Sequence, residues 1–288
     1  RFSENYYLHY PKVALGHWPP LFYLVQAGWT LALPPTRETM LALMAVLAAL
    51  LATTLFLFLR PRAPPAYAFA AGLALLLLPL VRDYSAMLMA DLLSALLAFL
   101  AALAFGKFLD TGHARAALGF GVFAALAILN KGSGFELAFI PPLGLLFSRR
   151  LDLLKRPAFW LPVLVVALLC GPWYVFAFDK MKNGFENPQG IASSIHAVFY
   201  YIPRLFKNLG IAISALALLG LYWRTLSQSL RRTSFSPGQN RPDGAWAAMA
   251  ALFIGVPVFH CVVTNADDTR YLLPALPAAI ALATAGTL

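Results

Sequence analysis

The run TMLALMAVLAALLATTLFLFL, residues 39–59, decides the fold class of this chain. It contains no charged side chain, and Arg60 and Arg62 follow it almost at once. A helix needs about 20 mainly apolar residues to cross the hydrocarbon core of a membrane. The run therefore predicts a transmembrane helix that ends at a basic cluster.

The composition extends this conclusion to the whole chain of 288 residues, of which 60% are hydrophobic and 12% charged. Soluble domains carry about 25% charged residues, so the chain is expected to be an integral membrane protein. A net charge of +10 can also indicate nucleic-acid binding. Here the basic residues lie between apolar runs rather than on one polar face, so we expect membrane lipids as partners and no nucleic acid.

Eight further apolar runs follow the first along the chain. They cover residues 66–81, 92–109, 114–129, 135–147, 158–178, 205–223, 245–263 and 271–288. We therefore predict an all-α, polytopic transmembrane helical bundle with about nine spans over residues 39–288. The long polar stretch 224–244 is basic and rich in Ser, Pro and Gly, which predicts a flexible loop between two spans.

The charges of the loops alternate along the chain and predict its orientation. One set of loops holds Arg60, Arg62, Lys107, Arg115, Arg149, Arg150, Lys155, Arg156, Arg224, Arg231, Arg232 and Arg241. The other set holds Asp83, Asp91, Asp179, Glu186, Asp267 and Asp268. Because cytoplasmic loops collect Lys and Arg, the first set, including loop 224–244, is expected in the cytoplasm and the second outside.

Residues 1–38 are then expected to form an extracytoplasmic loop, because span 39–59 must run from outside to inside. Within this loop the apolar run 21–33 is short for a span, a length that favours an interfacial segment. Trp18 and Trp29 suit the headgroup level of a membrane. We predict a juxtamembrane helix here, with a tilted true span as the alternative.

Asp91 is the most informative acidic residue, because the surrounding segment SAMLMADLLSALLAF offers it no partner. On a helix its neighbours would be Met87 and Ala95, so a partner must come from elsewhere in the fold. An intramembrane carboxylate suggests a functional site. The alternative is an aspartate that caps a helix N-terminus.

Two cations lie at predicted outer span ends. Lys131, in ILNKGSGF, could reach a phosphate or could be a snorkelling lysine in a glycine turn. The planar guanidinium of Arg270 matches phosphate geometry, although Asp267 and Asp268 are close enough to occupy it.

Four further residues carry weaker signals in the predicted outer segments. Glu4 reads as an ordinary loop acid, and His17 could donate to an anion or bind a metal. Glu136 lies in an apolar span and needs a partner. His196 opens an aromatic run that could be only a membrane-interface belt.

The sequence contains no Walker loop, HExxH, GxSxG or Rossmann fingerprint. Soluble nucleotide chemistry therefore has no recognisable site. Acids and cations at membrane depth on one face suit a substrate with an anionic headgroup and a lipid tail.

Six short motifs in order carry a resemblance to a known family. They are SENYYLHY followed by GHWPPLFYL, MADLLSALLAF, LNKGSGF, GPWYVFAF, HAVFYYIPRL and TRYLLPALP. Together they resemble the GT-C glycosyltransferases of the protein O-mannosyltransferase and aminoarabinose transferase branch. The resemblance implies a further span before Arg1 and more chain after Leu288.

The resemblance also implies a reaction. The donor would be a sugar on a polyprenyl phosphate and the acceptor a lipid or a protein. The active site would lie at the extracytoplasmic face of a bacterial-type inner membrane. Glu4 matches the second acid of the family's first loop, and Ser3 replaces the first.

The resemblance assigns roles to seven positions. Glu4 or Asp91 is expected to act as base, with a divalent metal between them as a possible cofactor. Substrate binding is expected from His17, Lys131, Arg270, His196 and Tyr271. The competing hypotheses are a transporter or lipid flippase, which would more often show inverted repeats, and a scaffold subunit that has lost activity.

Overall fold

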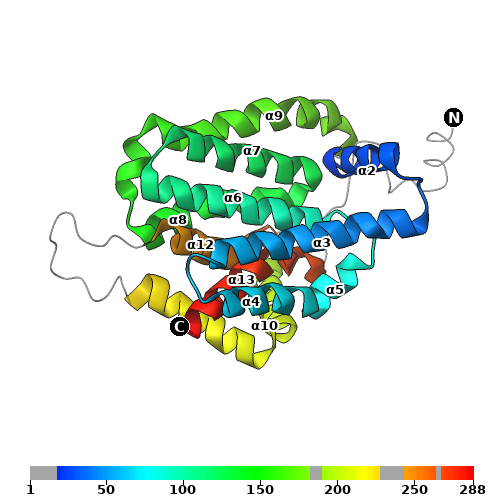
Figure 1. Ribbon diagram of the computed structural model, residues 1–288. Helices are drawn as coiled ribbons and strands as arrows, with labels where there is room; N and C mark the ends of the chain where they lie inside the picture. Colours follow the sequence, from blue (N-terminus) through cyan, green and yellow to red (C-terminus); the bar gives the residue numbers. More distant parts are fainter. Residues whose placement is uncertain (1–17, 182–189, 228–242, 264–266) are drawn as a thin grey trace.

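The computed structural model describes residues 18–181, 190–227, 243–263 and 267–288, and these residues form helices without strands (Figure 1). The predicted positions Glu4 and His17 lie outside the described residues. The α-helices are α2 (Leu21–Ala32), α3 (Arg37–Leu59), α4 (Pro65–Leu77), α5 (Pro79–Ser85), α6 (Asp91–Thr111), α7 (Ala114–Asn130), α8 (Ile140–Ser148), α9 (Pro157–Met181), α10 (Ile191–Leu221), α12 (Gly244–Val262) and α13 (Leu276–Gly286). Shorter 3-10 segments are η1 (Gly132–Phe139), η2 (Leu151–Lys155) and η4 (Thr269–Ala275), and η3 (Tyr222–Ser227) is a π-helix.

The prediction of an all-α membrane bundle is confirmed. Within the described residues, five helices are long and apolar enough to cross a membrane: α3, α6, α9, α12, and α10 continued by η3. The bent pair α4–α5 raises the number to six, and the shorter apolar helices include α7 and η1 with α8. Each of the nine predicted apolar runs corresponds to one helix or two consecutive helical segments, and only the last two runs extend past their helix, by one or two residues.

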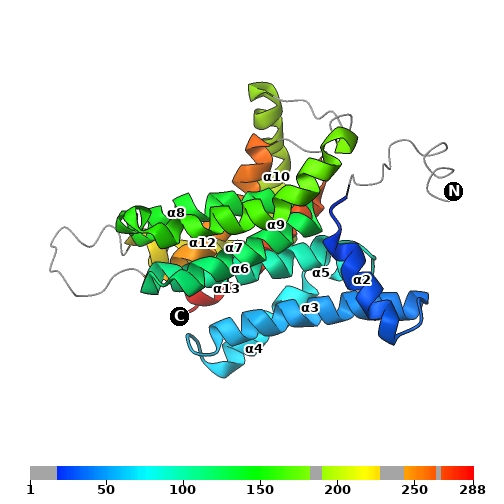
Figure 2. The same cartoon turned by 90° about the horizontal axis from the view of Figure 1, so that it is seen from above.

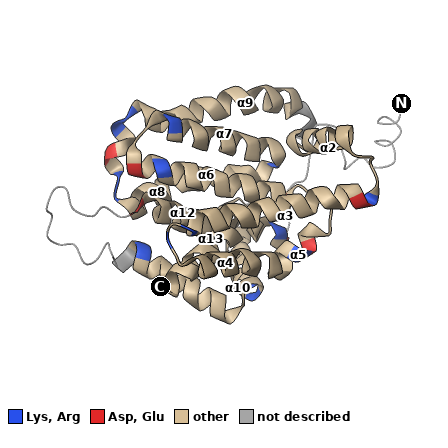
Figure 3. Ribbon diagram, in the orientation of Figure 1, with Lys and Arg blue, Asp and Glu red and all other residues tan. Residues whose placement is uncertain are grey.

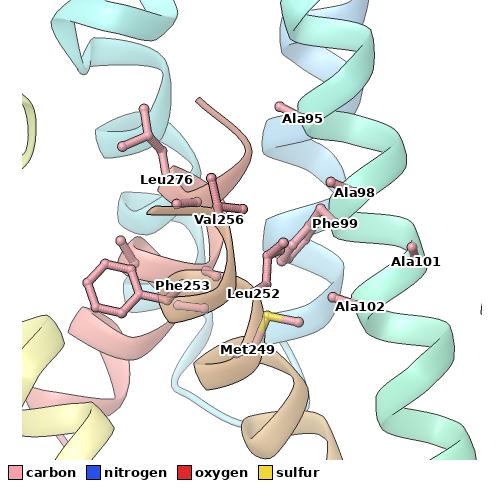
Figure 4. Close-up of a cluster of buried hydrophobic side chains, with 14 of the residues drawn as sticks. Ala95, Ala98, Phe99, Ala101, Ala102, Met249, Leu252, Phe253, Val256 and Leu276 are labelled. Carbon is pink, nitrogen blue, oxygen red and sulfur yellow. The ribbon is translucent and has the colours of Figure 1, made fainter. Parts of the chain in front are cut away.

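Two of these helices form the centre of the bundle. In α6 and α12, 78% and 83% of the most apolar window is buried, against 17% in α9. Figure 4 shows the contact between them, with Phe99 of α6 directed toward Leu252 of α12, and Leu276 of α13 nearby. Helices α4, α3, α6, α7 and α9 pack in that order, as Figures 1 and 2 show from two directions.

The predicted span 66–81 is broken into α4 and α5, which meet at 64°. The break falls at Leu78, whose backbone is extended (ψ 133°) and which precedes Pro79. A residue before proline avoids the helical conformation because the proline ring collides with it. The bend directs α5 across one end of α6, where α5 also packs against η4.

Helices α10 and α13 approach each other through glycines. A Cβ at Gly220 would overlap the carbonyl oxygen of Leu282, and a Cβ at Gly286 would overlap that of Leu216. In a membrane the hydrophobic effect does not drive helices together, because lipid is as apolar as the helix surface. Close van der Waals packing between small residues stabilises the helix pair instead.

We therefore expect Gly220→Ala to destabilise the protein by about 1–3 kcal/mol, because the added methyl group meets a backbone atom that cannot turn away. A thermal unfolding curve in detergent should show a clear fall in Tm. The matched control is Gly171→Ala in α9, where nothing lies within 4 Å of the added Cβ. Equal Tm values for the two variants would contradict the contact between α10 and α13.

The charged residues lie mainly at the ends of the helices, and the middle of the bundle is almost free of them in the described residues (Figure 3). At the end of α6, Arg150 donates to the carbonyl oxygen of Leu109, and Arg156 lies against Gly112. Asp91 begins the same helix, about 30 Å away for 21 residues. The basic end and the Asp91 end are thus separated by about one hydrocarbon thickness.

Candidate functional site

The site begins with a buried ion pair between Asp91 and Lys131. Lys131 Nζ lies 2.6 Å from Asp91 Oδ1, and the two side chains are only 5% and 4% exposed. Asp91 is the first residue of α6, and no side-chain cap of the preceding residue is present there. The partner that Asp91 needed is therefore Lys131, which lies 40 positions away in the sequence. The positive end of the α6 helix dipole also stabilises the Asp91 carboxylate.

Asn130 connects the end of α7 to the start of α6. Its Nδ2 donates to the carbonyl oxygen of Ala90 at 2.9 Å and to Ser94 Oγ at 2.7 Å, so the end of α7 is tied to the start of α6. Asn130 Oδ1 is buried and has no hydrogen-bond partner. Neither Asn130 nor Ser94 was predicted as a site residue, because a lone amide at a helix end carries no recognisable pattern.

The glycine turn after Lys131 brings the chain back against α7. Lys131 is extended (φ −158°), and η1 starts directly after it. A Cβ at Gly134 would lie 2.5 Å from the backbone carbon of Ala127, so only glycine fits this close approach. The turn therefore fixes the backbone that carries Lys131 at the surface of α6.

Tyr271 and Arg270 reach the same place from η4. Lys131 Nζ lies 4.4 Å from the centroid of the Tyr271 ring, a cation–π contact. The guanidinium carbon of Arg270 lies 5.4 Å from that centroid. One aromatic ring thus contacts both cations that were predicted to bind phosphate.

The second alternative for Arg270, pairing with a nearby aspartate, also holds. Arg270 Nε lies 3.1 Å from Asp268 Oδ2, at an angle that makes an ion pair without a directed hydrogen bond. Burial is the largest single influence and lowers the pKa of Arg270, but Asp268, Tyr271 and Asp91 together raise the pKa above its usual value. The guanidinium stays charged and keeps donors for a further anion.

His196 lies at the border of this cluster. Its Nε2 is 2.7 Å from Asp267 Oδ2, and both side chains are exposed, at 66% and 40%. Its ring stacks on Tyr200, which also carries the guanidinium of Arg204 at 3.6 Å. The structure joins His196 to the loop before Arg270 and gives it no direct contact with Lys131.

Glu136, which was expected to need a partner, pairs with His260. Its Oε2 lies 3.0 Å from His260 Nε2, and the side chains are 2% and 0% exposed. His260 was not predicted as a site residue, although a lone histidine in the apolar run PVFHCVV is itself a signal of a buried polar contact.

The predicted metal between Glu4 and Asp91 is not tested by the structure, because Glu4 lies outside the described residues. Over residues 18–181, 190–227, 243–263 and 267–288, no group of three or more His, Cys, Asp or Glu side chains could hold a metal ion. A cavity of ≈ 540 Å³ lies elsewhere, near the basic end of α6, and none of the five predicted site residues that the structure describes lines it.

Comparisons with known proteins agree with this architecture. A family model described as dolichyl-phosphate-mannose-protein mannosyltransferase matches residues 17–176. A search of curated protein sequences gives no match. Among solved structures, the chain is similar to ArnT from Cupriavidus metallidurans bound to undecaprenyl phosphate, with 19% identity and a TM-score of 0.64. It is similar to the apo state of the same enzyme with 18% identity and the same TM-score.

These alignments cover 99% of this chain and 53% of each solved chain, so the protein described here spans about half the length of those relatives. At this identity the likeness shows a shared fold. The family model, in contrast, matches more than half of the present chain and includes Asp91 and Lys131. On this evidence the chain belongs to the dolichyl-phosphate-mannose-protein mannosyltransferase family, within the GT-C glycosyltransferases.

Proposed function

We propose that this protein is a membrane glycosyltransferase that moves a sugar from a polyprenyl phosphate to a lipid or protein acceptor at the extracytoplasmic membrane face. The observation that carries the proposal is the convergence of Asp91, Lys131, Tyr271 and Arg270 at one end of the bundle. The solved relative named above binds undecaprenyl phosphate, which supports a polyprenyl-phosphate donor.

In the proposed reaction the bond between the sugar C1 atom and the phosphate oxygen breaks, and its electron pair stays on that oxygen. Lys131 and Arg270 stabilise the charge that develops on the phosphate. The acceptor hydroxyl oxygen forms the new bond to C1 and gives its proton to a carboxylate, either Glu4 or Asp91.

Asp91 can act as the base only if its ion pair with Lys131 is weakened first. A carboxylate that accepts a hydrogen bond from an ammonium group is a weaker base than a free one. Transfer of the Lys131 contact to the donor's phosphate would release the Asp91 carboxylate for the acceptor. Donor binding and activation of the base are thereby linked through one lysine.

The proposal is tested with the full-length protein in nanodiscs and a polyprenyl-phosphate sugar that is radiolabelled in the sugar. We expect loss of label from the carrier and its appearance in an acceptor from the cell envelope. The transporter and flippase hypothesis predicts the opposite pattern. Intact donor together with solute or lipid movement in proteoliposomes would overturn the transferase.

The proposed position of the site at the extracytoplasmic face gives a labelling prediction. The native cysteines, Cys170 and Cys261, are buried and are replaced with alanine. A cysteine at Ala86, exposed at the Asp91 end, should react with a membrane-impermeant maleimide in intact cells. A cysteine at Thr111, exposed at the basic end of α6, should react only after permeabilisation. The reverse result would place the site in the cytoplasm.

A further inference from the structure

Glu136 and His260 form a buried polar pair that the proposed reaction does not use. The pair joins η1 to the last turn of α12, two elements that are 124 residues apart in the chain. With exposures of 2% and 0%, neither side chain reaches solvent. Burying such a pair is costly, and an apolar pair of similar size is often as stable or more stable.

The imidazole of His260 packs directly against Tyr271. The two ring centroids lie 4.8 Å apart at 33°, and Tyr201, which is fully buried, lies 5.7 Å from His260. The Tyr271 ring in turn contacts the Lys131 ammonium at 4.4 Å. A single aromatic ring therefore separates the Glu136–His260 pair from the Asp91–Lys131 pair.

The two pairs also act on each other electrostatically. Glu136 and Lys131 lie on the same short turn, five positions apart. The carboxyl groups of Asp91 and Glu136 are both close enough to Lys131 to interact electrostatically with its ammonium group. A shift of the η1 turn would consequently move the lysine and the glutamate together.

We infer that Glu136 and His260 are positioning residues for Lys131: their hydrogen bond fixes the imidazole, the imidazole fixes Tyr271, and Tyr271 directs the ammonium toward the donor's phosphate. The inference rests on the proposed function for what Lys131 binds. It adds two residues, from η1 and α12, to the anion site that Asp91, Lys131, Tyr271 and Arg270 define.

The test is a variant that replaces the pair with apolar side chains, Glu136→Leu with His260→Phe. This variant keeps an aromatic ring against Tyr271 and removes the hydrogen bond that orients it. We expect an unchanged or higher Tm, because neither apolar replacement leaves a buried polar group of this pair without its partner. We also expect about a tenfold higher Kd for undecaprenyl phosphate, measured by native mass spectrometry of the full-length protein in nanodiscs, since the cation–π contact between Lys131 and Tyr271 is no longer held in its orientation.

Two further variants complete the test. His260→Gln keeps a donor for Glu136 but removes the ring, so it should also raise the Kd about tenfold. His260→Gln provides the test of the positioning role if the double variant does not fold. Glu136→Gln keeps the hydrogen bond and should leave the Kd within about twofold. Asp152→Asn, which breaks the Arg150–Asp152 pair at the basic end, is the matched control and should bind like wild type.

The outcomes separate the inference from the function on which it rests. A folded double variant that binds undecaprenyl phosphate as tightly as wild type would overturn the positioning role. Wild-type protein that does not bind this probe would also overturn it. Binding without any loss of sugar from the labelled donor would leave the positioning role intact and refute the proposed transferase.

Discussion

Replacing Lys131 with methionine is expected to lower kcat/KM for the polyprenyl-phosphate sugar by about a thousandfold. At an effective dielectric constant near 20, a cation 4 Å from a phosphate oxygen contributes about 4 kcal/mol, or about three decades in rate. Lys131 is 4% exposed, so solvent cannot replace its charge. The measurement is release of the carrier phosphate from radiolabelled donor by the full-length protein.

The same substitution leaves the Asp91 carboxylate buried without its partner, and this costs about 3–5 kcal/mol of stability. The matched control is Arg150→Met, which removes another buried cation from an ion pair, at the basic end of α6. Arg150→Met should lose stability but keep its turnover per folded molecule. The assignment of Lys131 fails if its methionine variant, normalised in the same way, turns over like wild type.

Replacing Asp91 with asparagine has the second large expected effect, a loss of about 10² to 10⁴ in kcat. Asparagine can still accept the hydrogen bond from Lys131, so the geometry of the pair is largely kept and the loss reports on the base. The control is Asp83→Asn, since Asp83 is an exposed acid on α5, eight residues earlier. This control should retain wild-type turnover.

Glu4→Gln distinguishes the two candidate bases. If Asp91→Asn remains active and Glu4→Gln does not, the base is Glu4, and Asp91 only holds Lys131 in place. If both variants turn over like wild type, neither carboxylate takes the acceptor's proton, and the catalytic assignment of both is wrong.

The resemblance to GT-C glycosyltransferases, based on six short motifs, led to the correct family. Three of these motifs, MADLLSALLAF, LNKGSGF and TRYLLPALP, lie at helix ends, where polar residues in an apolar chain are rare enough to be recognised. Single positions were harder to assign. Lys131 and Arg270 were identified as cations at span ends, but no pattern in the sequence indicated that one tyrosine ring contacts both.

Contacts between distant segments were the main gap. Asp91 and Glu136 each required a partner, yet Lys131 is 40 residues from Asp91 and His260 is 124 residues from Glu136. The tie from Asn130 to Ser94 was equally invisible. Such pairs depend on which helix ends meet, and no local spacing rule links residues so far apart in the chain.

Composition and the length of the apolar runs were sufficient to predict the solvent of this protein, a membrane, and its helical class. They could not predict which helices would be central. Helices α6 and α9 are similarly apolar, yet 78% of the α6 window is buried against 17% of the α9 window. Lipid and protein interior are equally apolar, so the sequence pattern does not distinguish a lipid-facing surface from a packed one. Only the close packing of small residues between helices, and the polar pairs that meet at their ends, decided that arrangement.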